Sequence, residues 1–238
     1  LNPAGDLNGK FTLLKKKLVP YAYVSPTLFL LLVLMLLPIV MVIAYSFFNN
    51  VIMNKNPQFF GFGNYVEILS DKNFHTAIKN TIFFTLASVV FHMVIGLVFA
   101  IFLNTKLLSS ITKSFFRVIY IFPWVFTAAI IAILWRLLLN PNGIINYILQ
   151  TLGFISEKME WLGDKNTALY ALTFINVWSG YPFFMISLLA GLQGISADLY
   201  EAATVDGANT IEKFFFVTIP QLKPIIVSMA MLDCIWTM

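Results

Sequence analysis

Long apolar stretches without charged residues alternate with short polar segments along this chain of 238 residues. An α-helix needs about 20 predominantly apolar residues to cross the roughly 30 Å hydrocarbon core of a membrane. Five stretches reach that length, and they predict membrane-spanning helices over about residues 24–48, 80–104, 118–138, 168–193 and 221–238. We therefore expect an all-α protein, a polytopic bundle of membrane helices that forms a single domain over residues 1–238.

Prolines and polar residues modify this pattern at three places. Pro38 lies inside the first predicted span, where a kink is expected. Pro220 and Pro224 precede the last span and should end a short helix before it. Residues 144–152 carry apolar side chains at helical spacing but follow the polar run 140–143, so they predict an interfacial helix rather than a further span.

Composition supports a membrane protein, because 59% of the residues are hydrophobic and 11% are charged, against roughly a quarter charged in soluble domains. The net charge of +4 does not indicate nucleic-acid binding, since the basic residues lie in short segments and form no dense stripe. Cys234 is the single cysteine, which excludes a disulfide framework and a CxxC metal site. Lys15, Lys16 and Lys17 precede a stretch too long for a signal peptide, so we interpret it as a retained span.

The distribution of lysine and arginine predicts the orientation. With the N-terminus in the cytoplasm, nine basic residues fall on the cytoplasmic side and six on the other, a modest positive-inside bias. We therefore expect a multi-pass protein of the cell membrane whose N-terminus and residues 195–224 are cytoplasmic.

Residues 195–224 form a polar segment between two apolar stretches, and their spacing predicts two short helices. Asp198 stands three residues before Glu201, the spacing of a capping box, so the first helix should begin at about Leu199.

A turn should separate these two helices. Asp206 and Gly207 suit a tight turn in which glycine adopts a positive φ without steric cost. Asn209 or Thr210 can cap the second helix, which should run to Phe216.

The same segment carries a resemblance to a known family. It reads EAA at Glu201–Ala203, DGA at Asp206–Ala208 and VTIP at Val217–Pro220. This pattern resembles the EAA loop of the membrane-spanning permease subunits of bacterial binding-protein-dependent ABC importers, and the DGA and VTIP parts are similar to the carbohydrate-type branch, with its maltose and glycerol-phosphate importers. FGNY at Phe62–Tyr65 and AGLQ at Ala190–Gln193 extend the resemblance over nearly the whole chain.

The resemblance implies a translocation subunit with no enzymatic activity and no cofactor of its own. Its expected partners are a second permease subunit, anticipated to be a paralogue, two ATP-binding subunits, an extracytoplasmic solute-binding protein, a sugar-like substrate and the lipid bilayer. The family has six spans, so the chain, with five, is expected to be incomplete at its C-terminal end. The ATPase-coupling interface is expected at Glu201, Ala202, Ala203, Asp206, Gly207 and Ala208. The alternative for these residues is an ordinary helix-turn-helix in which Glu201 only caps.

Asp233 and His92 are ionisable residues that lie well inside predicted spans. Asp233 falls about 20 Å up the last span, counted from Pro220, and should face the bundle interior. With Trp236 three residues on, it could contact a sugar in the substrate pathway; the alternative is a structural pair with a polar group on another helix. His92 lies alone in the second span, which favours a neutral imidazole hydrogen-bonded inside the bundle over a metal ligand.

Other function classes find less support. The chain has no G-x-x-x-x-G-K-[ST] run, so it cannot bind ATP through a P-loop, and no nucleophile and base stand at a recognisable spacing. An ion-gradient-driven secondary carrier or channel subunit remains the main alternative, although intramembrane ionisable residues are scarce for one. A purely structural membrane scaffold is a third.

Overall fold

The computed structural model describes residues 18–49, 56–105 and 107–238, and over these residues the regular structure is helical. Four helices are long and apolar enough to cross a membrane: Leu18–Tyr45, Lys72–Asn104, Ala168–Gln193 and Thr210–Thr237. A fifth span results if the bent pair Ser110–Val125 and Ala128–Leu138 is counted as one. The predicted all-α membrane bundle is confirmed. The chain divides into two compact units, and the boundary between them in the sequence lies between His75 and Thr76.

The first unit contains the helix Leu18–Tyr45, a loop and α3 (Gly63–Ser70). None of the most apolar part of Leu18–Tyr45 is buried within the chain, as expected for a surface that faces lipid or another subunit. Asn64 holds the loop to the end of this helix, because its side-chain amide donates to the carbonyls of Ser46 (2.8 Å) and Phe48 (3.0 Å).

Two wide turns accompany the prolines of the long helices. The π-helical turn η1 (Leu32–Leu36) precedes α2 (Leu37–Tyr45), which contains Pro38, and η2 (Phe214–Thr218) precedes α11 (Ile219–Thr237), which contains Pro220. In each turn a backbone N–H bonds five residues back, as Ile219 does to the Phe214 carbonyl. This spacing relieves the clash and the missing donor that a proline brings into a helix.

The helix that begins at Thr210 therefore continues through the prolines to Thr237. The expectation that Pro220 and Pro224 end a short helix before the last span was wrong. Pro220 lies in the first turn of α11, directly after the π-helical turn η2, and Pro224 lies further inside the helix.

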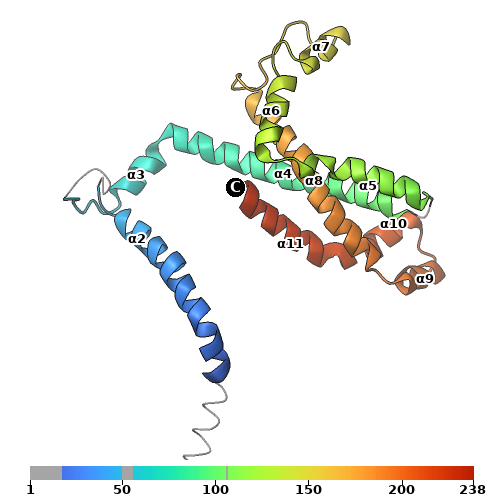
Figure 1. Ribbon diagram of the computed structural model, residues 1–238, viewed down its shortest axis with the longest axis horizontal. Helices are drawn as coiled ribbons and strands as arrows, with labels where there is room; N and C mark the ends of the chain where they lie inside the picture. Colours follow the sequence, from blue (N-terminus) through green and yellow to red (C-terminus); the bar gives the residue numbers. More distant parts are fainter. Residues whose placement is uncertain (1–17, 50–55, 106) are drawn as a thin grey trace, which may run out of the picture. The chain divides into compact units, whose positions relative to one another are not determined.

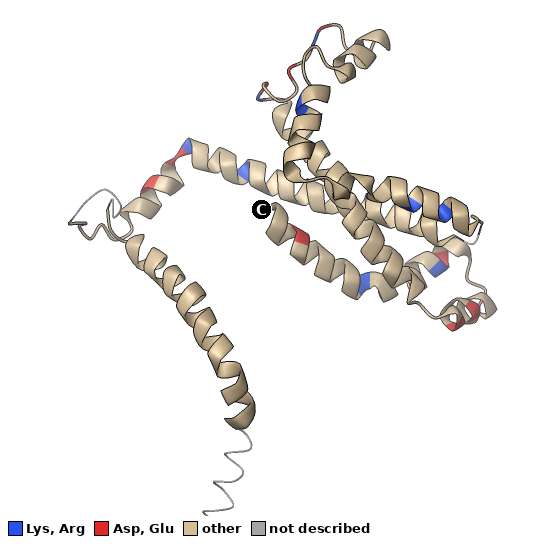
Figure 2. Ribbon diagram, viewed as in Figure 1, with Lys and Arg blue, Asp and Glu red and all other residues tan. Residues whose placement is uncertain are grey.

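The second unit is a bundle of α4 (Lys72–Asn104), α5 (Ser110–Val125), α8 (Ala168–Gln193) and α11, in which α8 packs against both α5 and α11 (Figure 1). Its core is an apolar cluster drawn from α4, α8 and α11 that includes Leu103, Met185, Leu188 and Leu222. In Figure 2 the lysines, arginines and acids lie mainly near helix ends and in connections.

Small residues let these helices approach closely. A Cβ on Gly96 would lie 2.6 Å from Cβ of Phe184 on α8, and a Cβ on Gly191 would lie 2.8 Å from Cδ2 of Leu222 on α11. Gly191 and Gly96 thus allow α8 to pack closely against α11 and α4.

The third predicted span, 118–138, is broken. α5 ends at Val125 and α6 (Ala128–Leu138) begins after a bend of 95°. Thr127 causes the break, because its backbone is extended and its side chain caps α6 by accepting from the N–H of Ile130. After α6 comes α7 (Ile144–Thr151), which matches the short helix expected over residues 144–152.

Candidate functional site

Residues 195–224, which we call the coupling segment after the role expected of them, contain two short helices. These are α9 (Ala197–Val205) and α10 (Thr210–Lys213). The capping box expected between Asp198 and Glu201 is not formed. Ser196 is the N-cap instead, and its hydroxyl accepts from the backbone N–H of Asp198 at 3.3 Å, so α9 begins two residues earlier than expected. Glu201 is therefore not the cap of α9 and lies exposed.

The turn between these helices has the expected form. Gly207 has φ +82°, and the N–H of Ala208 bonds the Ala203 carbonyl at 2.9 Å, which closes α9 with a Schellman motif. Asn209 caps α10 in a capping box with Glu212, whose side chain accepts from the Asn209 N–H at 2.7 Å. The N-x-x-E spacing of this box is visible in the sequence, although only the cap at Asn209 was expected from it.

The residues expected to bind an ATPase subunit lie together on the outside of this segment. Glu201, Ala202, Asp206 and Gly207 are exposed, whereas Ala203 and Ala208 are half-buried. Among the described residues other than the two chain neighbours of Gly207, no atom lies within 4 Å of the position of a Cβ on this glycine. The structure thus presents a small-residue surface with two carboxylates, which a second protein could reach.

Two hydrogen bonds fasten α9 to the long helix Thr210–Thr237. The hydroxyl groups of Tyr200 and Thr218 are 2.9 Å apart, and the Lys213 ammonium donates to the Thr204 hydroxyl at 2.8 Å. Thr218 lies in η2 and Lys213 ends α10, so both bonds reach the part of the long helix that precedes α11.

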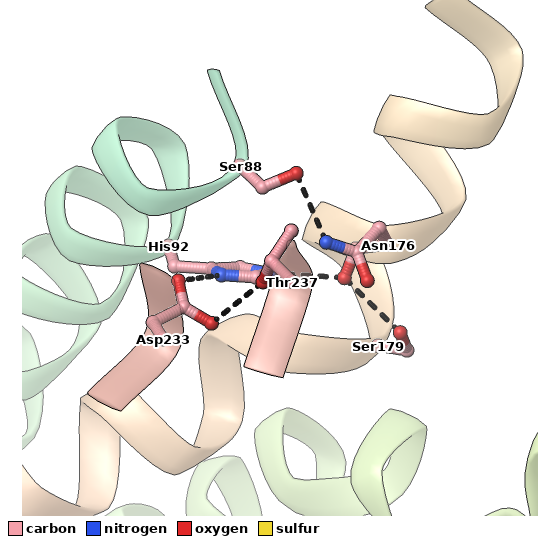
Figure 3. A network of polar contacts seen from close by, with 6 residues as sticks. All are labelled: Ser88, His92, Asn176, Ser179, Asp233 and Thr237. Carbon is pink, nitrogen blue, oxygen red and sulfur yellow. Dashed lines mark hydrogen bonds and ion pairs between the residues drawn. The ribbon is translucent and has the colours of Figure 1, made fainter. Parts of the chain in front are cut away.

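Six polar residues from three helices form what we call the α4–α8–α11 network, which lies away from α9 toward the C-terminal end of α11 (Figure 3). His92 of α4 and Asp233 of α11 are its centre, with Nδ1 and Oδ2 2.8 Å apart. The other members are Ser88, Asn176, Ser179 and Thr237. His92 is thus hydrogen-bonded inside the bundle, as was favoured from its position in the second span.

Every polar atom at this centre has a partner. Nε2 of His92 lies 3.0 Å from the Asn176 carbonyl, and the Thr237 hydroxyl donates to Oδ1 of Asp233 at 3.1 Å. The Asn176 side-chain amide donates to Ser88 at 2.9 Å. Burying such groups is costly only when they are unpaired, so the network stabilises the contact of three helices.

The hydrogen bonds of His92 orient its ring. A carbonyl oxygen only accepts, so the bond between Nε2 and the Asn176 backbone carbonyl is donated by His92. Nδ1 then lies on the side of Asp233, where it contacts Oδ2.

Gly180 makes room for this arrangement. A Cβ on Gly180 would collide with Nε2 of His92, and the ring also stacks on Phe184 with centroids 5.2 Å apart. The imidazole therefore lies directly against α8, because α8 has no side chain at this position.

Asp233 faces the bundle interior as expected, with 8% of its surface exposed, and it has a polar partner on another helix. Trp236 does not share that buried face, since 68% of its surface is exposed. Its ring contacts Phe183 of α8 at a centroid distance of 5.9 Å. The structure thus separates the two residues expected to act together in the pathway.

The chain matches a known family along most of this bundle. The model of the family described as "Binding-protein-dependent transport system inner membrane component" matches residues 92–238. The chain is a member of this family. In this permease the matched region begins at His92 and includes residues 195–224 and every member of the α4–α8–α11 network except Ser88.

The relatives of the permease include subunits of sugar transport systems. The trehalose/maltose transport system permease protein MalF of Thermococcus litoralis is 36% identical over 87% of this chain and 69% of its own length. The arabinooligosaccharides transport system permease protein AraP of Bacillus subtilis is 33% identical over 89% of this chain and 66% of its own. The resemblance to carbohydrate-type ABC importer permeases is confirmed.

A solved structure shares the permease fold. It is a bacterial alginate ABC transporter in complex with an alginate pentasaccharide-bound periplasmic protein, with a TM-score of 0.75 and 24% identity over 94% of this chain and 73% of that one. The family match, the named relatives and the candidate spans together make the permease a multi-pass membrane protein of the ABC importer family.

Proposed function

We propose that the chain forms, with a second permease subunit that is a paralogue, the translocation pathway for a sugar or related solute in an ATP-driven importer. Two separate ATP-binding subunits supply the energy, and an extracytoplasmic binding protein delivers the solute. The names of the relatives support a sugar as the transported solute, because trehalose, maltose and arabinooligosaccharides occur in those names. The neighbour solved with a periplasmic protein supports the delivery partner.

The observation that carries this proposal is the path from α9 to Asp233. The exposed residues of α9 are the surface that an ATP-binding subunit would grip, with the carboxylates of Glu201 and Asp206 available for charge-assisted bonds. Tyr200 and Lys213 fasten α9 to the helix whose upper part carries Asp233. Closure of the ATP-binding subunits would push α9, tilt this helix and switch the bundle between its two openings.

In this proposal the N-terminus and residues 195–224 are cytoplasmic. Trp236 lines the solute pathway together with Phe183, whose ring it contacts. Asp233 lies one turn from Trp236 and reaches solute hydroxyls only when its bond from Thr237 is exchanged for one from the solute.

The test is ATP-driven uptake by the assembled importer in proteoliposomes, with a panel of labelled sugars and vanadate as inhibitor. We expect vanadate-sensitive uptake of at least one sugar. In a pull-down assay with the permease as bait, we expect the Glu201→Arg variant to lose the ATP-binding subunit. Glu157→Arg, at an exposed position between α7 and α8, is the matched control and should leave capture unchanged.

The ion-gradient alternative predicts a different result. The buried pair of His92 and Asp233 is the kind of site that a proton-coupled carrier would use. Uptake that persists without ATP and collapses when the proton gradient is dissipated would support that alternative and contradict the proposal.

A further inference from the structure

The hydrogen bond between His92 and Asp233 ties α11 to α4. Within the described residues it is the one hydrogen bond that a side chain of α11 makes to another helix. Along the rest of its length α11 packs through apolar side chains such as Leu222 and Met229, which lie in the apolar cluster of the bundle. Apolar contacts have no preferred direction, whereas a hydrogen bond does, so this pair fixes the position of α11 relative to α4.

The pair tolerates little displacement of α11. Nδ1 of His92 and Oδ2 of Asp233 are 2.8 Å apart, and a hydrogen bond is lost when its heavy atoms separate beyond about 3.5 Å. Packed helices that switch between two states typically shift by about 1 to 2 Å. A shift of this size breaks the bond unless one side chain follows the other.

Neither side chain is free to follow. The His92 ring lies against α8 at Gly180 and stacks on Phe184. Its Nε2 also donates to the carbonyl of Asn176 on the same helix. The Asp233 carboxylate is bonded through Oδ1 to the hydroxyl of Thr237, one turn further along α11. The ring is therefore held by α4 and α8, the carboxylate is held by α11, and the pair separates when α11 shifts.

Each member of the pair has a second polar group on its own helix (Figure 3). Thr237 already donates to Asp233 and moves with it. Ser88 lies one turn before His92, is fully buried, and accepts from the Asn176 side-chain amide at 2.9 Å. Its hydroxyl hydrogen has no acceptor in the described part of the chain.

The Ser88 hydroxyl can therefore replace Asp233 as the partner of His92. A hydroxyl group both donates and accepts, so it can bond to Nδ1 whichever of the two atoms carries the hydrogen. Asp233 keeps its bond from Thr237 at the same time. Since burying a polar group is costly only when the group is unpaired, the separated arrangement is also a satisfied one.

We propose that His92 and Asp233 form a latch, which is closed in this conformation and opens during each transport cycle. A displacement of α9 moves α11, the bond between Nδ1 and Oδ2 breaks, and Ser88 and Thr237 hold the separated side chains. The latch thus gives the bundle two discrete states. The cycle rests on the proposed function, and the latch rests on the geometry of the pair. The alternative is a permanent tie, in which α4 and α11 move as one body.

The first test measures the distance between α4 and α11 in the assembled importer. In a Cys234→Ser background, spin labels are attached at Phe91→Cys on α4 and Met231→Cys on α11, two exposed positions close to the pair in the sequence. Double electron–electron resonance compares the nucleotide-free and vanadate-trapped states. We expect the distance to change by at least about 2 Å in the trapped state, whereas a permanent tie leaves it unchanged.

The matched control for this distance joins α4 to α5. Phe99 of α4 and Tyr120 of α5 stack with ring centroids 4.2 Å apart, so these helices are held together away from the pair. Labels at Phe91→Cys and Val118→Cys, which is also exposed, should report the same distance in both states.

A second test removes one of the two substitute partners and leaves the pair in place. Thr237→Val leaves Asp233 without a partner once the latch is open, so the open state becomes rarer. Uptake should fall about tenfold, the effect of one unsatisfied buried acceptor, and the trapped-state distance should return toward the nucleotide-free value. Thr173→Val is the matched control, because this buried hydroxyl bonds only the Leu169 carbonyl of its own helix, and it should leave both readouts unchanged.

Three outcomes would overturn the latch. These are an unchanged distance between α4 and α11 in the trapped state, an equal change in the control pair, and full uptake with an unaltered trapped-state distance in the Thr237→Val variant. A purely structural tie predicts a lower melting temperature for this variant and no effect on the distance. Any of these results together with normal vanadate-sensitive sugar uptake by the unmodified importer would reject the latch and leave the proposed function intact.

Discussion

His92 on α4 and Asp233 on α11 are 141 positions apart in the sequence, yet Nδ1 and Oδ2 lie 2.8 Å from each other inside the bundle. Asp233 is the one acidic residue within the five predicted spans. The pair therefore joins the second span to the last one, and it does so in a place where neither residue could remain charged alone.

Removing one member of this pair should cost more than removing both. His92→Leu or Asp233→Leu alone leaves a buried polar partner, and each should lower the free energy of unfolding by about 3 to 5 kcal/mol. The double variant leaves none and should recover most of that loss. Denaturant titration of the purified chain in detergent measures all three. A double variant that loses the sum of the single effects would show that the pair contributes nothing as a pair.

Gly180→Ala should destabilise the bundle through His92. The added methyl group would collide with the imidazole, and relief of such overpacking typically costs about 1 to 3 kcal/mol. Gly194→Ala is the matched control, since the nearest atom to its Cβ would lie 3.4 Å away. Thermal unfolding checks both, and His92→Ala should suppress the effect of Gly180→Ala. An unaltered melting temperature for Gly180→Ala would contradict the close contact.

Gly207→Val should uncouple ATP hydrolysis from transport. Valine is strained at φ +82°, so the Schellman turn opens and α9 loses its fixed direction. We expect retained hydrolysis by the assembled importer and at least about a tenfold loss of uptake in vesicles. Gly207→Asn, which tolerates a positive φ, should keep both activities. Normal uptake by the valine variant would count against the coupling role.

Asp233→Asn and Trp236→Phe distinguish a pathway role from a structural one. If Asp233 contacts the solute, the asparagine variant changes the KM for uptake and the preference among sugars, whereas a purely structural pair changes stability alone. Trp236→Phe removes an exposed indole, so it should alter uptake without lowering the melting temperature. Full uptake with unchanged preference in both variants would remove these residues from the pathway.

Most of the helices could be predicted, because apolar length is a local property of the sequence. The spans over 80–104 and 168–193 lie within or match α4 and α8. The break at Thr127 was harder to see, since the apolar pattern continues across it and the extended backbone depends on packing. The continuation through Pro220 was missed because a π-turn follows from backbone geometry and leaves no pattern in hydrophobicity.

The central pair could have been inferred from depth. His92 lies about 18 Å from the end of α4 at Asn104, and Asp233 lies about 20 Å above Pro220, both measured from the side that carries α9. Two polar residues at equal depth in neighbouring helices are natural partners. The role of Gly180 was beyond the sequence, because only the packing of α4 on α8 places a ring over that position.

The wide turn η2 also sets the direction of everything above it. A turn that takes up one additional residue shifts the angular register of α11 by about 100° relative to an uninterrupted α-helix. The orientation of the Asp233 carboxylate toward α4 thus depends on the five residues Phe214–Thr218. These residues lie near the opposite end of the helix Thr210–Thr237 from Asp233. Deleting one of them would straighten the helix and turn that acid out into lipid.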